Sequence, residues 1–170
     1  YLGEQAIVAS NTSGISINQL AESLPAARRS RFCGVHFFNP PRYMQLVELI
    51  PAVVTDAAML DALEAWLVTR MGKGVVRGKD TPSFVANRIG LFSILAVMYH
   101  TGQFKLGFDE VDALTGPRIG RPKSATFRTA DVIGLDTIAH VTDSQFETLP
   151  NDPWREYFKS PAWLSGLIGK

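Results

Sequence analysis

His36 and Glu48 are the two residues whose types and spacing best fit acid–base chemistry. They lie twelve positions apart, in Arg31-Phe-Cys-Gly-Val-His36 and Met44-Gln-Leu-Val-Glu48. If these segments pair as a hairpin centred on Arg42, the two residues face each other with Cβ atoms ~4.5–5.5 Å apart. A carboxylate at that distance can orient a neutral imidazole, which is a general base near neutral pH. A buried histidine and an edge glutamate that are neighbours by chance remain the alternative.

The residues around Glu48 favour such a pairing. Strand alternation places Leu46 and Ile50 on the same face as Glu48. An isolated carboxylate among aliphatic side chains costs on the order of several kcal/mol. Its most natural partner is therefore an imidazole nitrogen that carries a proton.

Four further polar residues stand where ligands bind in α/β proteins. Asn11 and Ser13 follow the first predicted strand, and Asn39 closes the strand that carries His36. Ligands of open α/β sheets bind beyond the carboxyl ends of the strands, so these residues are candidates for a shared site. Asn87 lies in the first turns of a predicted helix, where a carbonyl oxygen or an anion can bind. Ordinary turn-forming or helix-surface roles explain the same residues, so their functions stay open at this point.

The first eighty residues alternate predicted strands and helices, which indicates part of an α/β sheet. Short apolar runs predict buried strands, and leucines at helical spacing followed by Gly72 predict one longer helix. The predicted strands cover 6–10, 32–38, 44–50 and 73–79, and the predicted helices cover 16–22 and 56–71.

The pattern becomes helical after Asp80, which predicts two domains, 1–80 and 81–170. Thr81 is the predicted N-cap and Pro82 the predicted first residue of a helix that reaches His100. This helix is apolar on nearly all faces, as expected for a buried helix that also contacts a second subunit. Shorter helices are predicted at 108–114, at 124–149 with a break near Gly134, at 154–158 and at 162–168.

Bulk composition describes an ordinary globular protein of 170 residues, 46% apolar and 19% charged. The net charge of +1 indicates neither a nucleic-acid nor a membrane-surface partner. No apolar run approaches the ~18 residues of a membrane span, and no metal site is predicted. The single cysteine, Cys33, excludes an internal disulfide and fits a reducing, cytoplasmic location.

Two other patterns carry less weight. The segment Gly72-Lys-Gly74-Val-Val-Arg-Gly78 reads GxGxxxG and overlaps a predicted strand. The dinucleotide fingerprint is instead GxGxxG between a strand and a helix, and it is absent from this sequence. A basic cluster could meet a phosphorylated ligand, although a solvated loop is the simpler interpretation; it comprises Arg118, Arg121, Lys123 and Arg128.

Several motifs, in matching order and spacing, resemble the L-3-hydroxyacyl-CoA dehydrogenase family. They are Ser10-Asn-Thr-Ser13, Gly34-Val-His36-Phe-Phe-Asn-Pro40, Leu46-Val-Glu48, Lys79-Asp-Thr-Pro-Ser-Phe-Val-Ala-Asn87-Arg88, Gly120-Arg-Pro-Lys and Asp131-Val-Ile-Gly-Leu-Asp136. The resemblance covers nearly the whole chain and is strongest to the dehydrogenase portion of a bacterial multifunctional fatty-acid oxidation protein. It implies an α/β part followed by an all-α part. These are the C-terminal remnant of a Rossmann-type NAD-binding domain and a helical substrate-binding and dimerisation domain.

The resemblance also implies a reaction, the reversible NAD-dependent oxidation of an L-3-hydroxyacyl-CoA to the 3-ketoacyl-CoA in fatty-acid β-oxidation. It implies that His36 is the base, that Glu48 orients it, and that Ser13 and Asn87 bind or polarise the substrate oxygen. The implied partners are the acyl-CoA substrate and further copies of the chain in a homo-oligomer. The residues implied to lie near the NAD cofactor are Asn11, Ser13 and Asn39.

The chain departs from the family pattern at its start. The family begins with a strand, a GxGxxG loop and an acidic ribose-binding residue, and these would lie upstream of position 1. We therefore expect this segment alone to bind NAD weakly and to turn over poorly. We also expect its exposed sheet edge to be covered by self-association or by rearrangement of the first fifty residues.

Two other functions remain open. Ser13, His36 and Glu48 could form the triad of an acyl-CoA thioester hydrolase, although Ser13 lacks the GxSxG elbow of such enzymes. The chain could also be a non-catalytic module whose helical half serves only for assembly.

Overall fold

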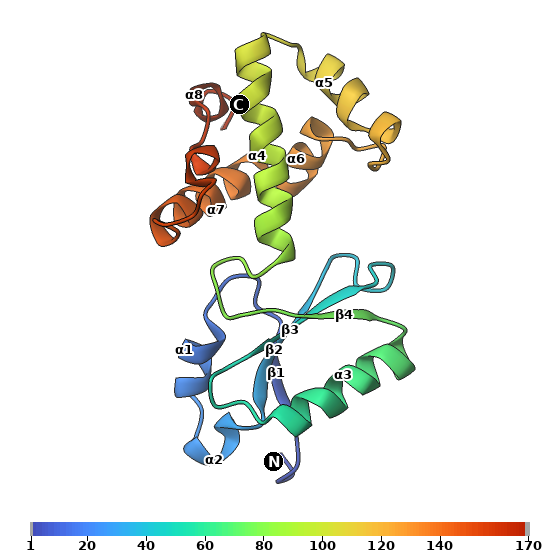
Figure 1. Ribbon diagram of the computed structural model, residues 1–170, viewed down its shortest axis with the longest axis vertical. Helices are drawn as coiled ribbons and strands as arrows, with labels where there is room; N and C mark the ends of the chain where they lie inside the picture. Colours follow the sequence, from blue (N-terminus) through green and yellow to red (C-terminus); the bar gives the residue numbers. More distant parts are fainter. Residues whose placement is uncertain (1, 169–170) are drawn as a thin grey trace. The chain divides into compact units, whose positions relative to one another are not determined.

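The chain forms two compact units, Tyr1–Asn87 and Arg88–Lys170. The structure, a computed structural model, describes residues 2–168 (Figure 1). The division lies within the first residues of a long helix, whereas the sequence analysis places the domain boundary between residues 80 and 81. The two units are described separately below.

The first unit is a four-stranded sheet in the order β1-β2-β3-β4 (Figure 1). β1 pairs parallel with β2, β2 antiparallel with β3, and β3 parallel with β4. The predicted α/β architecture is confirmed. In chain order the elements are β1 (Val8–Ser10), α1 (Ile17–Glu22), α2 (Ala26–Arg29), β2 (Phe32–Phe37), β3 (Leu46–Pro51), α3 (Ala57–Met71) and β4 (Gly74–Arg77).

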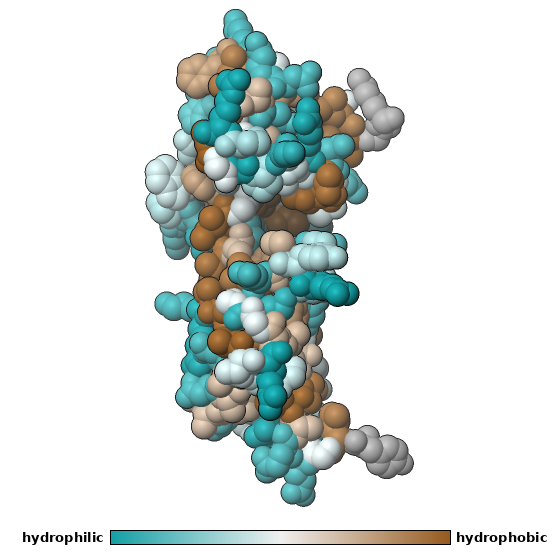
Figure 2. Space-filling view, turned by 90° about the vertical axis from the view of Figure 1, so that its right-hand side faces the viewer, coloured by the Kyte–Doolittle hydropathy of each residue, from teal (hydrophilic) through white to brown (hydrophobic). Residues whose placement is uncertain are grey.

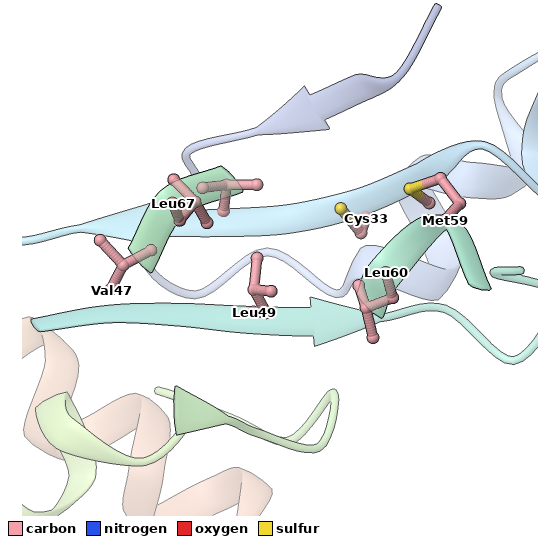
Figure 3. Close-up of a cluster of buried hydrophobic side chains, with 7 residues drawn as sticks. Cys33, Val47, Leu49, Met59, Leu60 and Leu67 are labelled. Atoms are coloured by element: carbon pink, nitrogen blue, oxygen red, sulfur yellow. The ribbon is translucent and has the colours of Figure 1, made fainter. Parts of the chain in front are cut away.

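The two faces of the sheet carry separate hydrophobic cores. Side chains of α3 point toward β2 and β3 on one face (Figure 3). That core contains Cys33, Val35, Val47, Leu49, Met59, Leu60 and Leu67. Alternate strand residues point to the opposite face, where α1 packs. The core on that face contains Ile17, Ala21, Phe32, Ile50, Ala52 and Phe84.

Gly34 allows α1 to approach the sheet closely. A Cβ atom at this position would lie 2.8 Å from Ile17 Cδ1 and 3.1 Å from Ile50 Cβ. Both distances are shorter than ordinary van der Waals contacts, so a larger residue at position 34 would push the helix outward. The start of α1 is thereby fixed close to β2 and β3.

A buried lysine holds the connection between β2 and β3. The Lys73 ammonium donates to the backbone carbonyls of Pro41 and Met44, at 2.5 and 2.7 Å. Because these carbonyls accept hydrogen bonds from a charged group, the loop is tied to the chain just before β4. The register of the two strands is centred on Arg42, as the sequence predicts.

The predicted start of the long helix is wrong. Thr81 and Pro82 are not its first residues, because the chain makes a turn with Ser83 and Phe84 at φ values of 61° and 50°. The helix, α4, begins at Ala86 and runs Ala86–Phe104. A left-handed pair of residues cannot belong to a right-handed helix.

The second unit is all helical, and the predicted break at Gly134 is confirmed. Its core is formed by Leu95, Met98, Ala130, Ile138 and Phe158. After α4 the elements are α5 (Phe108–Thr115), η1 (Pro117–Ile119), α6 (Phe127–Ile133), α7 (Leu135–Thr148), η2 (Arg155–Phe158) and α8 (Ala162–Ser165).

An ion pair ties α4 to the loop after α7. Arg88 donates to Asp152, whose carboxylate also accepts from the Trp154 backbone N–H at 2.7 Å. Burial raises the pKa of Asp152, but the hydrogen bonds from Trp154 and Arg88 outweigh it and leave the pKa below its ordinary value. Asp152 therefore stabilises this unit in its ionised form.

Hydrophobic and hydrophilic residues are interspersed on the face of the molecule drawn in Figure 2. Large hydrophobic side chains are exposed on both units, for example Val53 and Trp66 in the first and Phe104 and Val132 in the second. Within residues 2–168, no helix is long and apolar enough to cross a membrane.

Candidate active site

His36 and Glu48 meet on adjacent strands in the predicted register. They are paired residues of β2 and β3, and His36 Nδ1 lies 2.7 Å from Glu48 Oε2. Both are buried, with exposed fractions of 3% and 0%. A one-residue slip of the hairpin would place them on opposite faces of the sheet, so the register itself creates the pair.

The second carboxylate oxygen of Glu48 accepts two backbone hydrogen bonds. Val85 N and Ala86 N lie 3.0 and 2.7 Å from Glu48 Oε1. These amides belong to the start of α4, where backbone N–H groups have no partner within the helix. Glu48 therefore does what a side-chain N-cap normally does, from a strand that lies 37 residues earlier in the sequence.

These contacts determine which nitrogen of His36 carries its proton. An ionised carboxylate only accepts hydrogen bonds, so Nδ1 of the neutral imidazole is the donor to Glu48. Nε2 is then the acceptor and can take up a proton. A carboxylate against Nδ1 also stabilises the imidazolium cation that would result.

Ser13 lies on the other side of the imidazole. Its Oγ is 3.1 Å from His36 Nε2, so its hydroxyl can donate to the lone pair of that nitrogen. Ser13 is exposed, in the loop between β1 and α1. The structure thus brings three predicted site residues into one line, from an exposed hydroxyl through an imidazole to a buried carboxylate.

Two aromatic rings pack against the imidazole. The Phe38 ring centroid lies 4.5 Å from that of His36, and the Phe84 ring meets it edge-on at 5.7 Å. Phe84 adopts the left-handed backbone conformation of the turn before α4. The imidazole thus has polar partners at its two nitrogens and aromatic neighbours besides, and the sequence analysis did not identify these two rings.

The three asparagines take different places in the structure. Asn11 Oδ1 accepts from Phe37 N at 2.9 Å, which joins the loop after β1 to the end of β2. Asn39 is exposed in the connection after β2, and Asn87 is a half-buried residue of the first turn of α4. Among the described residues, neither Asn39 nor Asn87 hydrogen-bonds to His36, Glu48 or Ser13.

Asp80 is a carboxylate of the first unit whose contacts sequence reasoning missed. It accepts hydrogen bonds from Ser16, Ile17 and Asn18, at the start of α1. Asp80 belongs to the Lys79-Asp-Thr-Pro motif, but nothing local in that motif reveals its partners 62 to 64 residues earlier. These contacts could have been predicted only from knowledge that the loop after β4 lies against the start of α1.

The other residues singled out from the sequence lie apart from this line. Burial raises the pKa of the Cys33 thiol to about 11, so this cysteine is a poor nucleophile. Arg121 donates to Ser93 at 2.6 Å, and Arg128 lies 3.9 Å from Asp112, both within the second unit. Across residues 2–168, no three metal-ligating side chains of the His, Cys, Asp and Glu types gather in one place.

Solved structures of other proteins share this fold. The crystal structure of (S)-3-hydroxybutyryl-CoA dehydrogenase from Ralstonia eutropha is 34% identical, with a TM-score of 0.84 over 98% of this chain and 56% of that one. The rearrangement of the first fifty residues that we considered is therefore not observed. Self-association stays a prediction.

Curated relatives agree with the structural comparison. A Bacillus subtilis (strain 168) protein named "Probable 3-hydroxyacyl-CoA dehydrogenase" is 46% identical over 97% of this chain and 21% of its own length. A Rickettsia felis protein, whose name describes a trifunctional enzyme of a fatty acid oxidation complex, is 37% identical over 100% of this chain and 24% of its length. The chain thus spans about a quarter or less of these two relatives.

Family models match both units. Residues 1–81 match the NAD binding domain of 3-hydroxyacyl-CoA dehydrogenase, and residues 84–168 match the C-terminal domain of the same enzyme. Together with the fold and the relatives, these matches show that the chain belongs to the 3-hydroxyacyl-CoA dehydrogenase family.

Proposed function

We propose that the protein containing this chain oxidises L-3-hydroxyacyl-CoA to 3-ketoacyl-CoA with NAD, reversibly, in fatty-acid β-oxidation. The observation that carries the proposal is the line from Ser13 through His36 to Glu48, in a member of this dehydrogenase family. The named activities of the relatives support the substrate class, and the Rickettsia relative supports the metabolic setting.

His36 is the proposed base. As the C3–H bond of the substrate breaks and its hydrogen leaves as hydride, the proton of the 3-hydroxyl passes to His36 Nε2 and the C3–O bond becomes a carbonyl. Glu48 holds the proton-bearing Nδ1 and stabilises the imidazolium at 2.7 Å. The reverse reaction returns the same proton to the ketone oxygen, so one imidazole serves as base and as acid.

Ser13 and Asn87 are proposed to orient the substrate oxygen. The Ser13 hydroxyl already lies 3.1 Å from Nε2, where the substrate hydroxyl must arrive. Ser13 can therefore donate to the substrate oxygen while that oxygen faces the imidazole. Asn87 adds an amide donor near the start of α4, where the backbone also favours negative charge.

The donor set of the first unit fits the nicotinamide end of NAD. Asn11 and Asn39 follow the parallel strands β1 and β2, so both lie at the edge of the sheet where such ligands bind. Because Asn11 Oδ1 accepts from Phe37 N, its NH2 group is left as a donor toward a ligand. When bound, NAD supplies the hydride acceptor of the reaction.

The test uses the polypeptide from the complete reading frame that contains these residues. His36→Ala should lower 3-hydroxybutyryl-CoA oxidation, measured as NADH formation, by several orders of magnitude. His140→Ala is the matched control, because His140 is exposed in the second unit. Near-normal turnover of His36→Ala would contradict the proposal and favour a non-catalytic module.

The same geometry favours one second candidate, hydrolysis of an acyl-CoA thioester. Ser13, His36 and Glu48 have the connectivity of a nucleophile, base and orienting acid. However, Ser13 lies in an exposed Asn11-Thr-Ser-Gly14 loop rather than in a GxSxG elbow. Release of free CoA without NAD, together with covalent labelling of Ser13 by a fluorophosphonate, would select the hydrolase.

A further inference from the structure

Asp80 joins two segments of the first unit that are far apart in the sequence. It lies in the loop after β4, and its carboxylate accepts four hydrogen bonds from the start of α1. Oδ1 accepts from Ile17 N at 2.9 Å. Oδ2 accepts from Ser16 Oγ, Asn18 N and Asn18 Nδ2, at 2.7, 2.9 and 2.7 Å.

The segment on the α1 side carries Ser13. The loop from residue 11 to residue 15 has long-range anchors at its two ends. At its start, Asn11 Oδ1 accepts from Phe37 N. At its end, Ser16 and the first residues of α1 are bound by Asp80. Ser13 lies between these anchors, so its position at 3.1 Å from His36 Nε2 depends on both.

The segment on the other side of Asp80 leads to Glu48. Five and six residues after Asp80, the turn ends with the Val85 and Ala86 amides that bind Glu48 Oε1. The turn is short, and it is closed by the hydrogen bond that Phe84 N donates to the Thr81 carbonyl at 2.9 Å. The Asp80 carboxylate thus lies between the loop that carries Ser13 and the turn whose amides bind Glu48.

Asp80 is suited to this position as an anion. Burial raises its pKa, but the hydrogen bonds from Asn18, Ser16 and Ile17 outweigh that effect and leave the pKa below its ordinary value. Hydrogen bonds to an ionised acceptor are stronger than neutral ones, which suits an anchor between two loops.

We infer that Asp80 is a positioning residue, which holds the Ser13 loop and the Val85–Ala86 amides in place around His36. It acts on His36 through Ser13 and through Glu48 and does not itself touch the reacting atoms. The inferred effect on the amides is independent of the protein's activity, whereas the effect on turnover rests on the proposed dehydrogenase function.

The test compares Asp80→Ala with Asp56→Ala in the polypeptide from the complete reading frame. Asp56 is a matched control because it also caps a helix of the first unit, through Met59 N at 2.7 Å. That helix, α3, packs on the opposite face of the sheet. Both variants lose a capping carboxylate, but only Asp80→Ala removes the link between the two loops.

Hydrogen–deuterium exchange is the first readout, because it is independent of activity. In Asp80→Ala, peptides that cover residues 83–88 and 11–16 should exchange about 10- to 100-fold faster. The variant loses hydrogen bonds to a charged group, so local opening of these segments costs less free energy. In Asp56→Ala these peptides should exchange at the wild-type rate. Unchanged exchange of both peptides in Asp80→Ala would overturn the inference.

Steady-state kinetics is the second readout. Asp80→Ala should lower kcat about 10- to 100-fold with KM changed less than about threefold, because misplaced groups reduce turnover more than binding. An equal fall in Asp56→Ala would assign the effect to general destabilisation and overturn the inference. If the exchange results hold but the wild-type protein oxidises no 3-hydroxyacyl-CoA, the positioning role stands and the proposed function fails.

A milder variant covers the case in which Asp80→Ala does not fold. Asp80→Asn keeps one acceptor oxygen, which can still accept some of the hydrogen bonds from the start of α1. Its NH2 group would face at least one of the other donors and could not accept from it. Its exchange rates and kcat should lie between those of the wild type and Asp80→Ala. Wild-type values for both quantities in Asp80→Asn would contradict the need for an anion at this position.

Discussion

Glu48→Gln separates the two tasks of the Glu48 carboxylate. Oε2 accepts from His36, and Oε1 accepts from the Val85 and Ala86 amides. Glutamine has one acceptor oxygen and one NH2 donor, so it cannot accept hydrogen bonds on both sides. If its NH2 group faced the two amides, two half-buried donors would lose their acceptor, at about 1 kcal/mol each. The difference of about 2 kcal/mol favours the other orientation by about 30-fold, with the oxygen on the amides.

In the favoured orientation the glutamine NH2 group points at His36 Nδ1. Nδ1 must then accept a hydrogen bond, so the imidazole proton moves to Nε2. Nε2 becomes a donor toward Ser13 and can no longer take up the substrate proton. General-base catalysis contributes about 10²- to 10⁴-fold, so kcat should fall by that factor. KM should change less than about threefold, because no proposed CoA contact is altered.

Two measurements on Glu48→Gln test this reasoning. Steady-state NADH formation gives kcat and KM, and ¹⁵N NMR of the His36 ring reports which nitrogen carries the proton. Glu22→Gln is the matched control, an exposed carboxylate on α1 of the same unit. A proton that stays on Nδ1 in Glu48→Gln, or a kcat within about threefold of the wild type, would refute the tautomer mechanism.

Three further predictions concern other groups of the chain. The pKa values of Asp80 and Asp152 are lower in the folded protein than in the unfolded chain. These two carboxylates therefore contribute fully to the free energy of unfolding above the unfolded pKa of about 3.9, and they lose that contribution as the pH falls through their folded pKa values. Urea unfolding should therefore show steady stability from pH 7 to about 5 and a decline below about 4, and Asp80→Asn should reduce that decline. Cys33, with its pKa raised to about 11, should react with a thiol reagent at pH 8 only in urea; reaction within minutes in buffer would show that β2 is exposed. Isothermal titration of NAD into residues 1–170 alone should give only weak binding, because the sequence contains no GxGxxG cradle; low-micromolar affinity would contradict this.

The hairpin and its register were predictable because they depend on local periodicity. Side chains of a strand alternate between faces, so apolar neighbours fix which face Glu48 shares with His36. The helix α3 was predictable for the same reason, since Asp56 and Gly72 are end signals that act within one turn. In each case, residues close in sequence carry the physical cause.

The start of α4 was not predictable from the same kind of signal. Thr81 and Pro82 form a favourable local N-terminus, yet the helix begins at Ala86. The acceptor that Val85 and Ala86 need comes from Glu48, 37 and 38 residues earlier. A tertiary hydrogen bond to a charged group outweighs a local capping preference worth about 1 kcal/mol. The links of Asp80 to α1 escaped prediction for the same reason.

The use of Glu48 on both sides couples the proposed chemistry to the local fold. A replacement that keeps the acceptor for the α4 amides loses the acceptor for His36, and the reverse holds as well. Aspartate would retain the charge but is one methylene shorter, and the carboxylate of Glu48 spans contacts of 2.7 and 3.0 Å on its two sides. Glutamine cannot accept hydrogen bonds on both sides, and aspartate could reach both sides only if a strand or the turn moved. The position therefore requires glutamate for reasons of geometry as well as charge, even though its carboxylate need not contact the substrate.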